Sequence, residues 1–419
     1  MAQSNDSEQT GDTTFDELYR PLVEPLKQLE DEHPPHHLEK LSFKVFVRLL
    51  VYHFTKECKS GRLLLTDVKT AAKELKLSSV PHSTFFDAFK RFPVAWFVTL
   101  LSFLLTPVVW KAIPEMAALG KLYCVDGALF PAMATMLWAK YTSTHNAIRL
   151  HFCFELNRMI PAHFLVDTGN SSEKKALLQM LEAGATYIAD RGYYSFSLLA
   201  AIVAANAFFV FRAKSNLVYT RVKRLPVDLP DTVQHIFRHV TDQQVHVSNA
   251  AGRPIYRLVS FHVGKECYLI LTNRMDLTTF QAILLYAYRW QVELIFRFLK
   301  RSLNGLHLLS HSKEGVTIHF YALLIAALLE LRLKQLCVDL CESTRPAETT
   351  AQEETDQPAI TGLMINPDQL AGTRGSTFLA TIGAKLHRYW KIGQHWLVSL
   401  HNFLAHPFDQ RVIEVLGKL

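Results

Sequence analysis

The segment 286–300, YAYRWQVELIFRFLK, constrains this chain most, because it combines a helical pattern with an uneven distribution of charge. On a helix of ~3.6 residues per turn, its polar side chains fall within one arc of roughly 80°. They are Tyr286, Arg289, Glu293, Arg297 and Lys300. The rest of the helix is almost wholly apolar, and such a helix is normally buried. Because a buried glutamate needs partners, the segment predicts either an ion-pair ladder or a site where Glu293 holds a metal and the cations hold phosphate.

Two further acidic residues stand in apolar runs that are typical of buried strands: Asp126 interrupts one run, and Asp190 ends another. Asp126 follows Leu122-Tyr123-Cys124-Val125, and Asp190 follows Tyr187-Ile188-Ala189. Acids at the carboxyl ends of buried strands lie where open α/β sheets place their sites. With Glu293 they form a set of three carboxylates, which suit Mg²⁺ or Mn²⁺. Two such ions ~3.5–4 Å apart can serve both oxygens of an in-line phosphoryl displacement. Structural acids, acting as helix caps or turn formers, are the alternative.

The order of the apolar runs predicts a mixed α/β sheet. Period-two and short apolar runs predict strands over 122–130, 147–155, 159–166, 186–189 and 208–213. Helices are expected between the later strands, over 173–183 and 195–205. Three strands followed by helix, strand, helix and strand indicate such a sheet. Residues 215–275 break this rhythm and are β-rich, so we expect an inserted subdomain there.

The remaining chain is expected to be largely helical. Residues 15–118 are helical throughout, and the short helices 66–75 and 83–92 have the size of a helix-turn-helix, although an ordinary helical hairpin explains them equally well. Long helices are expected from near Leu277 and over 318–340. The other segments are a disordered tail (1–14), a polar linker (342–375) and a C-terminal helical segment (376–419).

Composition narrows the functional classes. The net charge of +7 is a modest lean toward polyanions. No Gly-rich phosphate loop supports nucleotide hydrolysis. The polar, acidic start of the chain is not that of a signal peptide. Residues 92–110 carry no charge, and we expect a buried helix of a soluble protein there rather than a membrane span.

At these residues the chain resembles a known family. Tyr286, Arg289, Glu293 and Lys300 reproduce the spacing of the Y-R-E-K signature of bacterial insertion-sequence transposases of the IS-four family. Residues 123–127 (YCVDG) and 189–193 (ADRGY) are similar to that family's first and second acid boxes. The resemblance covers about residues 40–340.

The resemblance implies a DDE transposase with a ribonuclease-H-like core over 119–214 and 276–340, interrupted by the β-rich insertion. Asp126, Asp190 and Glu293 would be the catalytic ligands of two Mg²⁺ (or Mn²⁺) ions. Tyr286, Arg289 and Lys300 would hold DNA, and the region 15–118 would bind the transposon ends. It also implies terminal inverted repeats and target DNA as partners, a homodimer on DNA, and a cytoplasmic, nucleoid-associated protein.

Three further basic residues, and the lack of tryptophan in the insertion, bear on how the chain would contact DNA. Arg212 and Lys214 end the fifth strand, and with Arg297 they are candidate phosphate contacts or, alternatively, solvated cations. Members of the family are similar to enzymes that cleave through a hairpin, with a flipped base held by a tryptophan of the insertion. Residues 215–275 contain no Trp, so another aromatic residue would have to stack on the base.

Two other functions are compatible with the same residues. A metal-dependent nuclease of this fold would cut DNA without joining it. A DNA-binding protein derived from a transposase would keep the acids without using them. A strand-transfer assay on pre-cleaved ends distinguishes a transposase, which gives products of higher mass, from a nuclease, which gives fragments alone. An Asp190→Ala variant that keeps its function in vivo would identify the DNA-binding protein.

Overall fold

The computed structural model divides the chain into two compact units. The first comprises Met1–Val108 with Phe298–Ser399, and the second Val109–Arg297 with Leu400–Leu419. The structure describes residues 13–55, 60–75, 79–105, 114–158, 160–248, 252–297, 299–300, 307–343 and 415–416. The expected linker (342–375) and C-terminal helical segment (376–419) therefore lie outside the described residues, apart from 342–343 and 415–416.

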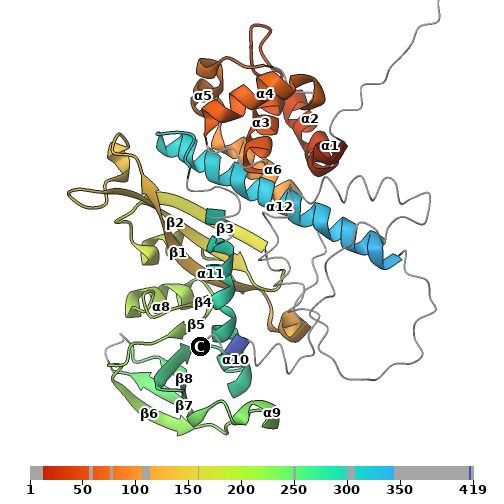
Figure 1. Ribbon diagram of the computed structural model, residues 1–419. Coiled ribbons are helices and arrows are strands. Elements are labelled where there is room, and N and C mark those ends of the chain that lie inside the picture. Colours follow the sequence, from red (N-terminus) through yellow and green to blue (C-terminus); the bar gives the residue numbers. More distant parts are fainter. Residues whose placement is uncertain are drawn as a thin grey trace, which may run out of the picture. The chain divides into compact units, whose positions relative to one another are not determined.

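The first unit consists of helices around an aromatic core. Its elements are α1 (Thr13–Tyr19), η1 (Arg20–Leu22), α2 (Val23–Glu32), α3 (Phe43–Thr55), α4 (Gly61–Leu75), α5 (His82–Arg91), α6 (Val94–Leu105) and α12 (Lys313–Ser343) (Figure 1). α12 packs chiefly against α3 and α6. The buried ring of Phe46 on α3 lies 5.0 Å from Phe89 and 5.7 Å from Phe85, both on α5. Edge-to-face pairs of this kind anchor a core.

The helices expected in this unit are present, with shifted ends. α1 begins at Thr13, inside the expected tail, and α12 extends the predicted 318–340 helix in both directions. α4 and α5 are the predicted short helices, and α4 starts earlier, at Gly61. Their use as a DNA-reading pair remains a prediction.

The uncharged stretch 92–110 forms α6 as far as Leu105. Its side chains Phe97, Leu100 and Leu104 are buried within the unit. Among the described residues no single helix is long and apolar enough to cross a bilayer. The pair of α5 and α6 reaches that length and composition only together, with a bend of 83° between them.

The second unit is built on one mixed sheet. Its nine strands lie in the order β3-β2-β1-β4-β5-β9-β8-β7-β6. They are β1 (Leu122–Ala132), β2 (Asn146–Glu155), β3 (Ile160–Thr168), β4 (Thr186–Ala189), β5 (Phe208–Arg212), β6 (Tyr219–Arg224), β7 (Arg238–Val247), β8 (Ile255–Val263) and β9 (Glu266–Thr272). β1, β4 and β5 are parallel to one another, and the other neighbours are antiparallel. This confirms the predicted mixed α/β sheet.

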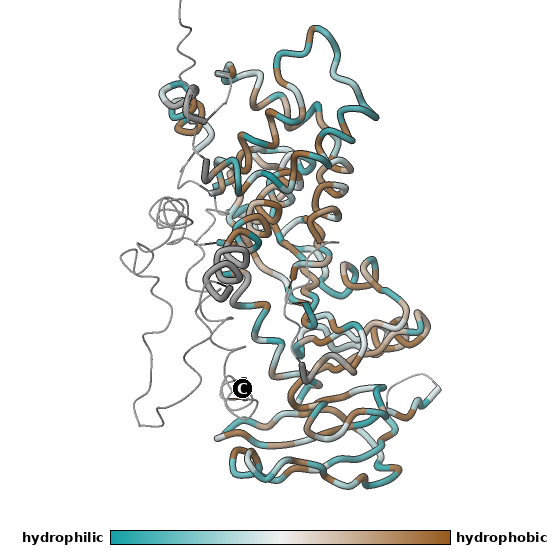
Figure 2. The backbone as a smooth tube through the Cα atoms, turned by 90° about the vertical axis from the view of Figure 1, so that its right-hand side faces the viewer, coloured by the Kyte–Doolittle hydropathy of each residue, from teal (hydrophilic) through white to brown (hydrophobic). Residues whose placement is uncertain are grey.

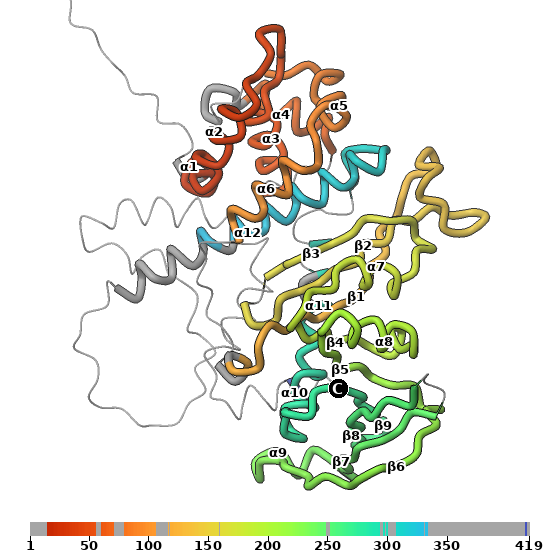
Figure 3. The backbone as a smooth tube through the Cα atoms, turned by 180° about the vertical axis from the view of Figure 1, so that it is seen from behind, coloured from red at the N-terminus to blue at the C-terminus, as the bar shows by residue number. Residues whose placement is uncertain are grey.

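Helices cover both faces of this sheet. They are α7 (Glu173–Gln179), α8 (Phe196–Ala204), α10 (Thr279–Tyr288) and α11 (Trp290–Arg297), with α9 (Asp231–Gln234) and the short turns η2 (Pro114–Leu119) and η3 (Leu137–Ala139) outside the layers. On one face, Val125 of β1 shares a buried cluster with Leu177 of α7 and Leu198 of α8 (Figure 3). On the other, Phe152 of β2 packs on Phe296 of α11, with ring centroids 5.4 Å apart. Successive residues of a strand alternate between faces, so the sheet is covered on both sides at β1 and β2.

The predicted β-rich insertion contributes β6 to β9, which continue the same sheet. β9 pairs antiparallel with β5, so the insertion is joined edge to edge to the parallel strands. In Figure 2, hydrophilic and hydrophobic residues alternate along these strands, at the bottom of the view. The outermost strand, β6, is exposed along its whole length and carries Arg221, Lys223 and Arg224. Charged side chains on an edge strand discourage pairing with another chain.

The prediction of a single helix over 286–300 is wrong in one respect, because the helix is interrupted at Arg289. α10 ends at Tyr288 and α11 starts at Trp290. The amide of Arg289 donates to the carbonyl of Tyr286 at 3.1 Å, and the amide of Val292 donates to the carbonyl of Arg289 at 3.1 Å. These i→i−3 bonds tighten the turn as in a 3₁₀-helix. The helix is therefore interrupted between Tyr286 and Glu293, two residues of the predicted polar arc.

Candidate active site

Asp126 and Asp190 lie side by side at the centre of the sheet. β1 and β4 are parallel neighbours in which Cys124 pairs with Ile188. Asp126 lies two residues beyond Cys124 within β1, and Asp190 lies two residues beyond Ile188, directly after the end of β4. Burial raises the pKa of the Asp126 carboxyl to about 6, with further contributions from Asp190 and Glu173, against the opposing effects of the Gly127 amide and Arg289. The two predicted acid boxes thus meet in space.

Each of these aspartates is held by a backbone amide that follows it. Oδ1 of Asp126 accepts a hydrogen bond of 2.8 Å from the amide of Gly127. Oδ1 of Asp190 accepts one of 2.8 Å from the amide of Gly192. Such short-range bonds fix the carboxyl orientation at a turn.

The side chain of Asp126 faces the helix α11. Asp126 pairs with Phe152 across the β1–β2 ladder, and directly opposite residues share a face. Phe152 in turn packs on Phe296 of α11. The alternation along β1 places Val125 on the other face, in the cluster with α7 and α8. The segment that dominates the sequence pattern therefore packs on the face that bears Asp126.

Arg289 forms an ion pair with Glu293 and also lowers the pKa of Asp126 through its charge. Its Nη2 lies 3.0 Å from Oε1 of Glu293, and the two side chains are 17% and 33% exposed. Burial alone lowers the pKa of the Arg289 guanidinium, but Tyr286, Asp126 and Glu293 together raise it above its usual value. Arg289 is thus a fixed positive charge between two of the three predicted carboxylates.

The donor chemistry of Asp126 and Asp190 fits a hard divalent cation. Carboxylate oxygens are the ligands that Mg²⁺ and Mn²⁺ prefer. Glu293 is engaged with Arg289, and among the described residues no group of three His, Cys, Asp or Glu side chains is arranged to hold a metal. The convergence of all three carboxylates on one site stays a prediction.

A row of cations and aromatic rings runs from β5 to α10. The Arg212 guanidinium lies 4.2 Å from the ring centroid of Tyr268, whose ring lies 6.1 Å from that of Tyr286. Arg289 lies 5.9 Å from the Tyr286 ring. Arg212 also approaches Glu266, at 3.4 Å. The row brings together three of the six side chains predicted to contact DNA.

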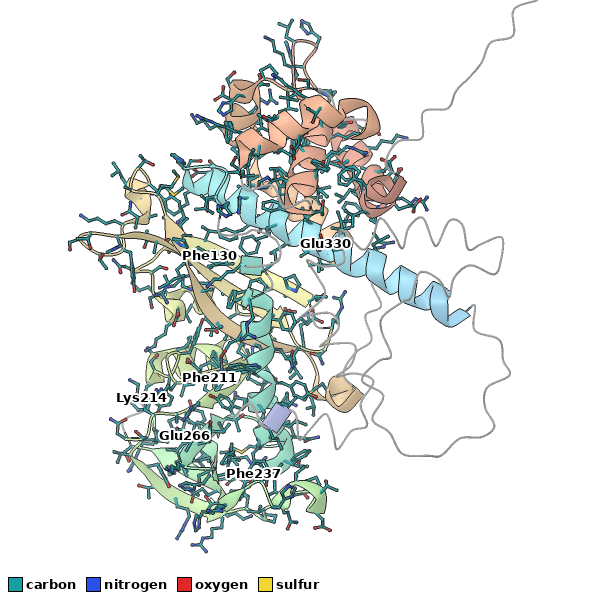
Figure 4. All side chains as sticks on the ribbon, in the orientation of Figure 1. Phe130, Phe211, Lys214, Phe237, Glu266 and Glu330 are labelled. Carbon is teal, nitrogen blue, oxygen red and sulfur yellow. The ribbon has the colours of Figure 1, made fainter. Side chains whose placement is uncertain are left out.

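The other three predicted contacts lie outside this row. Lys214 is exposed just beyond the end of β5 (Figure 4). Arg297 is exposed at the end of α11. Lys300 is half-buried and belongs to the first unit.

Glu173 is a residue that the sequence did not single out. It is the first residue of α7, after the cap Ser172, and was expected only as a helix start. A Cβ atom built on Gly127 would lie 2.5 Å from Oε1 of Glu173. Its other oxygen, Oε2, lies 3.7 Å from a Cβ built on Gly192. The signal in the sequence that could have indicated a neighbouring group is the glycine in each acid box, because a glycine can mark the close approach of another group to the backbone.

Comparison with known proteins gives a consistent family. A family model described as a transposase DDE domain matches residues 119–329. A putative transposase, y4zB, of Sinorhizobium fredii is 28% identical over 284 residues, which are 65% of this chain and 78% of that protein. A probable transposase for insertion sequence element IS5377 of Geobacillus stearothermophilus is 25% identical over 193 residues, 46% of this chain and 51% of that protein.

Among solved structures, a piggyBac transposase synaptic complex with hairpin DNA matches with a TM-score of 0.33 and 10% sequence identity. The match covers 85% of this chain and 91% of that chain.

Proposed function

The chain belongs to the DDE transposase family and is a DNA transposase, and from that premise we propose that Asp126, Asp190 and Glu293 carry its chemistry. The observation that carries the proposal is the proximity of Asp126, within β1, to Asp190, directly after the parallel strand β4, on a sheet covered by α11, the helix that bears Glu293. A partly buried acid with a raised pKa beside a cation, such as Asp126 beside Arg289, is typical of an active site.

The family uses divalent metal ions, and we assign two Mg²⁺ or Mn²⁺ ions to the three carboxylates. When bound, such ions lower the pKa of an attacking water or 3′-hydroxyl and stabilise the leaving oxygen. Asp126 would bind from within β1 and Asp190 from just after β4, and Glu293 would join them from α11 once Arg289 releases it. In the joining step the 3′-oxygen of the transposon end forms a bond to a phosphorus of the target DNA. The bond between that phosphorus and the 3′-oxygen of the target strand breaks.

Arg289 and its aromatic neighbours would hold the DNA. A guanidinium that is freed from Glu293 can donate to a phosphate in two parallel hydrogen bonds. Tyr286 and Arg212 extend this cationic and aromatic surface along α10 and β5, and Lys214, Arg297 and Lys300 add charge for the backbone. We assign no tryptophan to the holding of a flipped base during hairpin formation, because the insertion (residues 215–275) contains none.

The finer assignments rest on several features. The order β3-β2-β1-β4-β5, with β1, β4 and β5 parallel, supports a ribonuclease-H-like core. The spacing of Tyr286, Arg289, Glu293 and Lys300 supports the IS-four family. The helical region 15–118 would bind the terminal inverted repeats. Cleavage of two transposon ends together would require a homodimer on DNA. The protein would then be associated with the nucleoid.

A strand-transfer assay tests this function. Pre-cleaved, labelled ends taken from the DNA that brackets the gene are incubated with the full chain, a plasmid target and Mg²⁺. We expect products larger than the target, which contain the labelled strand joined to plasmid. Fragments alone would instead identify a metal-dependent nuclease, and no reaction with intact binding would identify a DNA-binding derivative.

A further inference from the structure

The carboxyl group of Glu173 lies against both acid boxes. The three atoms nearest to a Cβ built on Gly127 all belong to Glu173, at 2.5, 3.2 and 3.3 Å. Around Gly192, Oδ1 of Asp190 and Oε2 of Glu173 would lie 3.0 and 3.7 Å from such a Cβ. One oxygen of this carboxylate therefore lies against the backbone that follows Asp126, and the other lies near the turn that follows Asp190.

Glu173 reaches this place from the face opposite α11. Gly127 alternates with Asp126 along β1, so the missing side chain of Gly127 is on the face that α7 and α8 cover. α7 leads into β4 and begins at the end of the sheet where β4 stops, which brings its first residue beside Asp190. The carboxylate fills the space beneath the two aspartates.

Arg149 holds Glu173 there. Nη1 of Arg149, on β2, donates to Oε1 of Glu173, and its Nε donates to the carbonyl of Gly169 at 3.0 Å. The side chains of Arg149 and Glu173 are 19% and 26% exposed. Because the guanidinium is tied to the backbone at a second point, the carboxylate has a fixed orientation, with Oε2 directed to the Asp190 turn.

Glu173 also adds negative charge to a group of buried acids. It contributes to the raised pKa of the Asp126 carboxyl, after burial and Asp190. After burial, it is the largest cause of the raised pKa of the Tyr193 hydroxyl, which is itself buried. Like charges so close together are relieved when a cation binds among them.

We propose that Glu173 is a positioning residue of the active site, which with Arg149 sets the spacing and charge of the Asp126 and Asp190 boxes for a divalent cation. This inference rests on the proposed function, since it presumes that the two aspartates bind the ion. Glu173 contacts no substrate in this account. It acts through the backbone of Gly127 and Gly192 and through its charge.

The test is a Mn²⁺ titration followed by electron paramagnetic resonance, on the full chain without DNA. Glu173→Gln keeps the shape of the side chain and its hydrogen bond from Arg149 but removes the charge. We expect its Mn²⁺ affinity to fall by about 10-fold, as for other residues that orient metal ligands. The matched control is Glu182→Gln, which removes a carboxylate of the same unit that is paired with Lys121, and its affinity should equal that of the wild type.

A second pair of variants tests the contact itself. Gly127→Ala places a methyl group where the Glu173 carboxylate lies, so it should weaken Mn²⁺ binding in the wild-type background. In the Glu173→Ala background the same change should have little additional effect, because the obstructing carboxylate is gone. This comparison remains decisive if Glu173→Gln lowers thermal stability.

The outcomes separate this inference from the proposed function. Asp126→Asn should abolish Mn²⁺ binding if the aspartates hold the ion. Loss of binding in Asp126→Asn, with wild-type affinity in Glu173→Gln and equal effects of Gly127→Ala in both backgrounds, would overturn the role of Glu173 alone. Wild-type Mn²⁺ affinity in Asp126→Asn would overturn the metal assignment as well.

Discussion

At the scale of single residues, Arg289 is the side chain whose role depends most on what is bound. Its Nη2 lies 3.0 Å from Oε1 of Glu293, and it contributes positive charge at Asp126. A guanidinium in this place repels an incoming metal ion but attracts a phosphate. The same residue therefore favours a site in which Glu293 joins the two aspartates only when DNA binds.

Arg289→Gln should shift two affinities in opposite directions. Without DNA, Mn²⁺ should bind about fivefold more tightly, which corresponds to ~1 kcal/mol of relieved repulsion. Binding of a labelled transposon end should weaken, because a phosphate contact is lost. Electron paramagnetic resonance and gel-shift titrations measure the two. Weaker Mn²⁺ binding in this variant would show that Arg289 supports the metal site instead of competing with it.

At the scale of elements, one buried ion pair fixes the insertion to α10. Nη2 of Arg257 on β8 lies 2.5 Å from Oδ2 of Asp242 on β7, and these side chains are 5% and 0% exposed. Asp242 also accepts a hydrogen bond of 2.7 Å from the Thr279 hydroxyl at the start of α10. α10 carries Tyr286, so this pair links the edge of the sheet to the proposed DNA-binding surface.

Asp242→Ala should destabilise the second unit strongly. It leaves the Arg257 guanidinium buried without its counter-ion, which costs about 3–5 kcal/mol. Urea unfolding of the full chain measures the change, and Asp231→Ala, on the exposed helix α9 of the same insertion, is the control with little expected effect. A loss below ~1 kcal/mol would mean that water reaches Arg257.

The helix α3 carries a built-in sensitivity to acid. Burial, and to a smaller extent His307, lowers the pKa of His53 to about 4. The unfolded chain binds a proton at this residue near pH 6.5, so between pH 6.5 and 4 it holds more protons than the folded chain. Stability should therefore fall as the pH falls through this window, by at most ~3 kcal/mol from His53.

His53→Leu should flatten that part of the pH dependence. Unfolding free energies of both proteins are measured at several values between pH 7 and 4. Other buried histidines titrate in both proteins, so the difference between the two curves isolates His53. Parallel curves would show that His53 does not remain neutral in the fold.

At the scale of the whole molecule, the sequence predicts the sheet better than it predicts the site. The strands that carry Asp126 and Asp190 were found because apolar runs and period-two patterns reflect burial directly. The break at Arg289 was missed because no Gly or Pro marks it. Glu173 was missed because its position beside Gly127 depends on how α7 crosses the sheet, which spacing along the chain does not encode.

The same contrast applies to the three carboxylates. Asp126 and Asp190 come close together because each lies two residues beyond a residue of the pair Cys124 and Ile188 in the β1–β4 register. The position of Glu293 depends on a helix that is packed on the sheet and held by Arg289, so no local pattern fixes its distance from the aspartates. Fold and family are therefore accessible from the sequence, whereas the final geometry of the site also depends on its ligands.

The most direct test of the account is single-turnover joining of pre-cleaved ends in Mg²⁺ by Asp126→Asn, Asp190→Asn and Glu293→Gln, with gel-shift binding measured in parallel. Each variant should join at least ~10³-fold more slowly, about 4 kcal/mol of barrier, while binding the ends within ~3-fold of the wild type. Joining at the wild-type rate by any one of the three would contradict the account, because that carboxylate would then have no part in the reaction.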